Sequence, residues 1–155
     1  AQARDLVRAM RYPPQGIRGS GAALARASQF SSVPNYITTA NDQMCLLVQI
    51  ESRAAVEALD DILAVEGVDG IFIGPSDLAN DMGHLGDSNA PEVRDTIKDV
   101  LARAAASDTA ACILATDHDT ALTYRDWGAQ VMAVGIDVLM LAQTARAVAQ
   151  KWRNG

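Results

Sequence analysis

The sequence predicts an α/β fold built on a parallel β-sheet. Four short apolar runs lack the strict apolar–polar alternation of a half-exposed strand, and they read MCLLVQI (44–50), GIFIG (70–74), ACILA (111–115) and QVMAVGI (130–136). Such continuous runs are typical of parallel strands covered on both faces. Segments with helical periodicity separate the runs, and this alternation of strand and helix predicts βαβ units.

The helices are predicted from their apolar faces and end signals. They cover residues 1–14, 53–65, 91–105, 117–127 and 137–153. Pro91 suits the first turn of its helix, and Gly128 is a C-terminal cap signal for the helix before it. The glycines of residues 16–21 predict a packed turn ahead of a further helix, GAALARASQF (21–30), rather than a phosphate-binding loop.

The composition is that of one globular unit. The chain has 155 residues, of which 49% are hydrophobic and 21% charged, and its net charge of -6 offers no broad basic face for nucleic acid. The apolar runs are far shorter than the roughly 18 residues of a membrane span, so we expect no membrane association and a cytoplasmic location. Cys45 and Cys112 lie in apolar runs and are expected as packed, reduced thiols.

Two carboxylates follow the first two predicted strands. Glu51 comes directly after the first run, and Asp77 follows the second through Gly74-Pro75-Ser76. Because the carboxyl ends of parallel strands meet at one edge, we expect Glu51 and Asp77 to be neighbours. Two carboxylates with open positions around them suit Mg²⁺ or Mn²⁺. The alternative is that each acid only stabilises the start of a helix.

Two further features belong to the same edge. Alternation along the first strand places Gln49 on the same side as Glu51. Gly74 and Pro75 form a tight exit from the second strand, and Ser76 or Asp77 can begin the next turn with free backbone N–H groups that could hold a small carboxylate.

Several motifs together resemble the HpcH/HpaI family of metal-dependent pyruvate aldolases. They are RYPPQGIRG (11–19), ANDQM (40–44), QIE (49–51), EGVDGIFIGPSDLANDMG (66–83) and VMAVGID (131–137). The resemblance implies a (β/α)8 TIM barrel, of which residues 1–155 form a single domain covering roughly the last four βα units, the C-terminal three-fifths. It also implies a homo-oligomer, usually a hexamer.

The resemblance assigns roles to particular residues. Glu51 and Asp77 match the ligands of a divalent metal (Mg, Mn or Co), and Gly74, Ser76 and Asp77 match the backbone that holds pyruvate. Gln49 is expected beside the metal or its water, and Leu114 in the aldehyde pocket. The family's His-Asp base and substrate-clamping Arg fall in the part that precedes these motifs, so we assign no catalytic base. His84 and His118 are expected to be exposed polar residues.

The implied activity is a lyase reaction. It is the metal-dependent retro-aldol cleavage of 4-hydroxy-2-oxoheptane-1,7-dioate, or a similar 4-hydroxy-2-oxo acid, to pyruvate and an aldehyde such as succinic semialdehyde. Lys98 and Lys151, the only lysines, lie in predicted helices and not after a strand, so the sequence does not suggest a Schiff base. The alternatives are a 2-keto-3-deoxy sugar acid aldolase of the same family and a non-catalytic partial barrel that binds metal and pyruvate.

Overall fold

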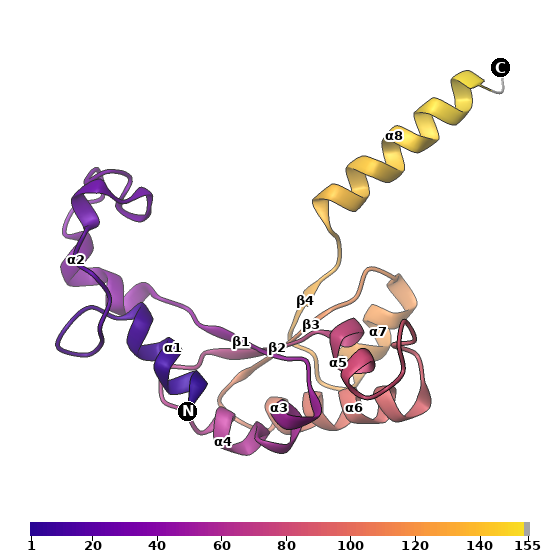
Figure 1. Ribbon diagram of the computed structural model, residues 1–155, viewed down its shortest axis with the longest axis horizontal. Coiled ribbons are helices and arrows are strands. Elements are labelled where there is room, and N and C mark those ends of the chain that lie inside the picture. The colour runs from indigo at the N-terminus through magenta and orange to yellow at the C-terminus, as the bar shows by residue number, and fades with distance from the viewer. Residues whose placement is uncertain (154–155) are drawn as a thin grey trace.

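The computed structural model describes residues 1–153 and contains a parallel four-stranded sheet (Figure 1). The strands lie side by side in chain order, as β1 (Leu47–Ile50), β2 (Gly70–Ile73), β3 (Ala110–Leu114) and β4 (Val131–Ala133). Each neighbouring pair is parallel, which confirms the predicted sheet. The first and last strands are shorter than their apolar runs, because residues 44–46 and 134–136 extend beyond the ladder.

The helices precede, connect and follow the strands, and the sequence did not predict those at residues 36–39 and 75–81. They are α1 (Gln2–Met10), α2 (Tyr36–Thr39), α3 (Arg53–Glu57), α4 (Leu59–Leu63), α5 (Pro75–Asp81), α6 (Pro91–Ala105), α7 (His118–Asp126) and α8 (Asp137–Arg153). The single helix predicted for residues 53–65 is wrong, since the backbone leaves helical geometry at Ala58, with φ -88° and ψ 9°. Leu59, directly after this break, is fully buried.

The helix predicted for residues 21–30 is also wrong. The segment forms two short 3₁₀ turns, η1 (Ala22–Leu24) and η2 (Arg26–Ser28). The Ser28 hydroxyl donates to the carbonyls of Ala22 and Ala25, and such local bonds compete with a regular helix. Gln29 and Phe30 then adopt φ values of 50° and 54°, which end any right-handed helix.

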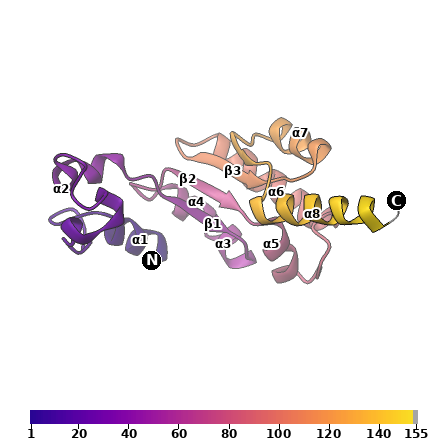
Figure 2. The ribbon, with the colours of Figure 1, turned by 90° about the horizontal axis from the view of Figure 1, so that it is seen from above.

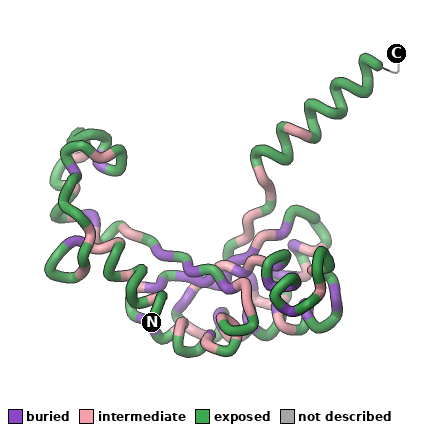
Figure 3. Tube along the Cα trace, viewed as in Figure 1, coloured by how far each residue is buried: buried purple, intermediate pink, exposed green. Residues whose placement is uncertain are grey.

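The core lies on one face of the sheet. Val48 and Ile50 of β1, Ile71 and Ile73 of β2 and Ile113 of β3 are buried in a cluster with apolar side chains of α4, α5, α6 and α7. Figure 3 shows buried residues along the strands and mixed buried, intermediate and exposed residues in the helices beside them.

The opposite face is only partly covered over the described residues, contrary to the expectation that both faces are covered. Leu47 is 42% exposed and Val131 49% exposed.

The two cysteines differ in burial. The prediction that Cys45 is packed is wrong, because Cys45 precedes β1 and is exposed, whereas Cys112 in β3 is buried. Burial raises the pKa of the Cys112 thiol.

Two extensions flank the sheet. Residues 11–44 form an N-terminal arm that includes η1, η2, α2 and η3 (Ala40–Gln43), and α8 extends from the end of β4 (Figures 1 and 2). Within the arm, the Arg18 guanidinium lies 4.6 Å from the ring centroid of Tyr12 and 5.6 Å from that of Tyr36. Among residues 1–153, no helix has both the length and the apolar character needed to cross a membrane.

Candidate metal and oxo-acid site

The ladder between β1 and β2 brings Glu51 and Asp77 to one edge of the sheet. Ile50 pairs with Ile73, and the next N–H along, that of Gly74, donates to the Ile50 carbonyl at 3.2 Å. A methyl group on Gly74 would lie 3.2 Å from Oε2 of Glu51 and 3.9 Å from Oδ2 of Asp77. One oxygen of each carboxylate therefore lies within 4 Å of the position that a Gly74 methyl would take, and the contact with Glu51 is the tighter of the two.

The start of α5 leaves backbone donors free at the same place. Pro75 is the first helical residue and has no N–H to satisfy, and the N–H of Leu78 makes the first intrahelical bond, to Gly74 O at 2.9 Å. The N–H groups of Ser76 and Asp77 have no intrahelical acceptor at these positions. Both residues are exposed, whereas Pro75 and Leu78 are buried and anchor the turn.

Gln49 and Leu114 lie on the open face of the sheet. Gln49 pairs with Phe72, which pairs with Cys112, and Leu114 is two residues farther along β3 and so points the same way. Gln49 is exposed and Leu114 is half-buried. A cavity of about 430 Å³ next to α1 is lined by Gln49 and Ser52, but its lining includes neither Glu51 nor Asp77.

The donor set fits a hard divalent cation with an incomplete protein shell. Among residues 1–153, no group of three or more His, Cys, Asp and Glu side chains could enclose a metal. A cation held by Glu51 and Asp77 would therefore keep positions for water or for a bound molecule. Mg²⁺ and Mn²⁺ accept such a carboxylate site, whereas structural zinc takes four protein ligands.

Sequence reasoning missed a set of contacts between the two segments that carry these acids. The backbone N–H of Arg53 donates to Oδ2 of Asp81 at 2.7 Å, and its guanidinium donates to the Met82 carbonyl at 2.8 Å. Glu92 accepts from the Arg53 guanidinium at 3.2 Å and from Nε2 of His84 at 3.0 Å. The hydrogen bond from His84, reinforced by the charge of Arg53, lowers the pKa of Glu92.

The remaining ionisable candidates lie on helices or in a loop. His118 is exposed at the start of α7, and His84 is a partly exposed residue whose ring contacts Glu92. Both positions agree with the expectation of surface polar residues. Lys98 and Lys151 are exposed on α6 and α8.

The sequence pattern of the HpcH/HpaI aldolase/citrate lyase family matches residues 1–144. The chain belongs to this family. A hydroxypyruvate/pyruvate aldolase of Roseovarius nubinhibens is 68% identical to it over 153 residues, which are 99% of this chain and 60% of that protein. A 4-hydroxy-2-oxo-heptane-1,7-dioate aldolase of Escherichia coli is 50% identical over 151 residues, which are 97% of this chain and 58% of that protein.

Solved structures carry the same arrangement. An HpcH/HpaI aldolase/citrate lyase family protein from Burkholderia cenocepacia J2315 superposes with a TM-score of 0.86 at 37% identity, over 97% of this chain and 60% of that one. The four-stranded sheet therefore corresponds to part of the TIM-barrel fold of this family, and the chain spans about 60% of the length of these relatives.

Proposed function

We propose that the protein is a class II pyruvate aldolase that cleaves a 4-hydroxy-2-oxo acid into an oxo acid and an aldehyde. The observation that supports it most directly is that Glu51 and Asp77 each place a carboxylate oxygen within 4 Å of the methyl position of Gly74, the residue that precedes α5. The family relationship adds to this support.

In the proposed mechanism, Glu51 and Asp77 hold a divalent cation, Mg²⁺, Mn²⁺ or Co²⁺. When bound, the cation supplies Lewis-acid stabilisation of the negative charge that retro-aldol cleavage leaves on the pyruvate fragment. The N–H groups of Ser76 and Asp77 bind the substrate carboxylate, and Gly74 leaves space for it. Gln49 orients a water or the substrate, and Leu114 shapes the aldehyde pocket. The described residues do not suggest a general base, and we assign none.

The leading candidate substrates are aldol adducts that release pyruvate or hydroxypyruvate, because the Roseovarius nubinhibens relative named for both matches at 68% identity. Cleavage of 4-hydroxy-2-oxoheptane-1,7-dioate to pyruvate and succinic semialdehyde is the second candidate, supported by the 50% identity to the Escherichia coli relative. A 2-keto-3-deoxy sugar acid is the third. Initial rates on these three substrate classes, read as oxo acid released, would rank them.

The experiment that tests the proposed function uses the two acids. Retro-aldol turnover is measured with Mg²⁺, Mn²⁺ or Co²⁺, after chelation, and in the variants Glu51→Gln and Asp77→Asn. We expect activity that requires the cation and is lost in both variants, while circular dichroism shows an unchanged fold. Turnover that survives chelation or either substitution would contradict the proposal.

A non-catalytic role is the remaining alternative. In that case residues 1–155 would act as a metal- and pyruvate-binding partial barrel without turnover. Binding of Mn²⁺ together with oxamate, in the absence of any cleavage, would favour this role over the aldolase.

We further propose that residues 1–155 form one domain of a cytoplasmic homo-oligomer, with a hexamer as the expected state. Apolar side chains of α8 are uncovered within the described residues, with Leu141 72% exposed and Trp152 86% exposed, so α8 is the surface at which assembly is tested. Sedimentation velocity on the protein and on a Leu141→Glu variant tests this. We expect the variant to shift to smaller species, and a monomer before substitution would contradict the oligomer.

A further inference from the structure

Two charged residues occupy helix ends where a helix dipole disfavours them. Arg53 is the first residue of α3, at the end where negative charge is favoured, and Asp81 is the last residue of α5, where positive charge is favoured. A charge placed against the helix dipole indicates that another interaction offsets its cost.

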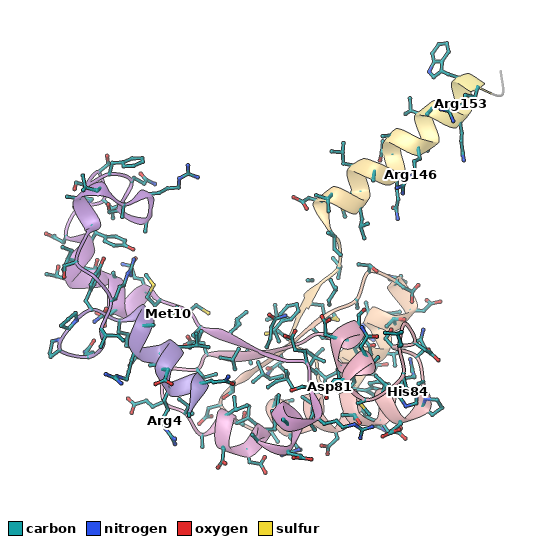
Figure 4. All side chains as sticks on the ribbon, viewed as in Figure 1. Arg4, Met10, Asp81, His84, Arg146 and Arg153 are labelled. Carbon is teal, nitrogen blue, oxygen red and sulfur yellow. The ribbon has the colours of Figure 1, made fainter. Side chains whose placement is uncertain are left out.

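The compensation is that each side chain hydrogen-bonds a backbone group at the end of the other helix. The first N–H of α3, which has no intrahelical acceptor, donates to the Asp81 carboxylate at 2.7 Å. The guanidinium of Arg53 in turn donates at 2.8 Å to the carbonyl of Met82, the residue that caps the C-terminus of α5. Figure 4 labels Asp81 at the end of α5 and His84 in the loop that follows.

This pair of caps joins the two segments that carry the acids. Arg53 is two residues after Glu51, and Asp81 is one helical turn after Asp77 on α5. Glu92, at the start of α6, accepts from Arg53 at 3.2 Å and so fixes the guanidinium from a third element. The separation between the Glu51 and Asp77 carboxylates therefore depends on the contacts of Arg53 and Asp81 as well as on the β-ladder.

We propose that Arg53 and Asp81 are positioning residues that hold Glu51 and Asp77 at the separation a divalent cation requires. The inference rests on the proposed function, because it takes these two carboxylates as the metal ligands. Neither residue is proposed as a ligand of the cation. They act as outer residues that orient ligands, and loss of such residues typically weakens metal binding by 10- to 100-fold.

The test is calorimetric titration with Mn²⁺ alone, at a temperature where circular dichroism shows every variant folded. Arg53→Met removes the bond to Met82, and Asp81→Ala removes the acceptor for the Arg53 N–H, so the two variants break different bonds. Asp81→Asn keeps an oxygen acceptor and serves as the conservative rescue. Glu51→Gln reports on the metal ligand itself.

Arg103→Met is the matched control. Arg103 also joins two helices, through Asp60 of α4 at 2.8 Å and Asp99 of α6 at 3.1 Å, but it does not contact the segments that carry Glu51 and Asp77. Its loss should therefore lower stability and leave Mn²⁺ affinity unchanged.

We expect Arg53→Met and Asp81→Ala to bind Mn²⁺ about tenfold more weakly, with Asp81→Asn and Arg103→Met close to the unmodified protein. Unchanged affinity in Arg53→Met and Asp81→Ala, together with loss of binding in Glu51→Gln, would overturn the positioning role and leave the metal site standing. Equal weakening in Arg103→Met would also overturn it, because the effect would then be general. Unchanged binding in Glu51→Gln would overturn both the metal site and the inference.

Discussion

Gly74→Ala should weaken metal binding without unfolding the protein. The added methyl would lie 3.2 Å from Oε2 and 3.3 Å from Cβ of Glu51. Ordinary contacts are about 3.5–4.0 Å, so Glu51 must move by a few tenths of an ångström. The backbone of Gly74, at φ -98° and ψ 90°, is open to alanine, so the substitution adds no backbone strain.

The two effects of this substitution differ in size. A ligand displaced by a fraction of an ångström should cost about tenfold in Mn²⁺ affinity, or about 1.4 kcal/mol. Overall stability should change by less than about 1 kcal/mol, because the reduced freedom of the unfolded chain offsets the tight contact. Calorimetric titration with Mn²⁺ and urea unfolding measure the two quantities separately.

Gly83→Ala is the control, in which stability should fall while Mn²⁺ affinity stays the same. Gly83 has φ +89°, and no atom lies within 4 Å of the position that its methyl would take. The variant should lose about 1–2 kcal/mol of stability through backbone strain and keep its Mn²⁺ affinity. The account would be refuted if Gly74→Ala bound Mn²⁺ as tightly as the unmodified protein, or if Gly83→Ala weakened binding equally.

Two further predictions concern stability. Leu101→Ala should cost about 2–5 kcal/mol in urea unfolding, because Leu101 is fully buried on α6, and a loss under about 1 kcal/mol would contradict this packing. Glu92 has a lowered pKa, so its contribution to stability should be complete above pH 4.5 and vanish as the pH falls through the lowered value. The melting-temperature difference between the protein and Glu92→Gln should therefore shrink on acidification, and a constant difference would count against the His84–Glu92 bond.

Much of the fold follows from local pattern. Buried parallel strands need continuous apolar runs, and Pro91 and Gly128 mark helix ends, so the order of the strands and of the longer helices was predictable, whereas the short α5 was not predicted. The break at Ala58 was not, because Ala58 favours a helix and carries no end signal. The burial of Cys45 was predicted wrongly because an apolar run does not show at which residue strand pairing begins, and β1 begins only at Leu47.

The candidate site, too, was predictable only in part. Convergence of Glu51 and Asp77 follows from the rule that parallel strands end at one edge, and Gly74 marks the close approach. The contacts of Arg53 and Asp81 depend on how α3 and α5 pack, which no local pattern fixes. The one available signal was an arginine at a predicted helix start, against the usual preference for an acid there.

The most direct test of the central claim is the nuclear relaxation of pyruvate methyl protons in the presence of protein and Mn²⁺. Mn²⁺ is paramagnetic, so a pyruvate held beside it on the protein relaxes faster than pyruvate with either component alone. We expect this enhancement for the unmodified protein and its loss in Glu51→Gln and Asp77→Asn. An equal enhancement in these variants would mean that Glu51 and Asp77 do not hold the cation that binds pyruvate.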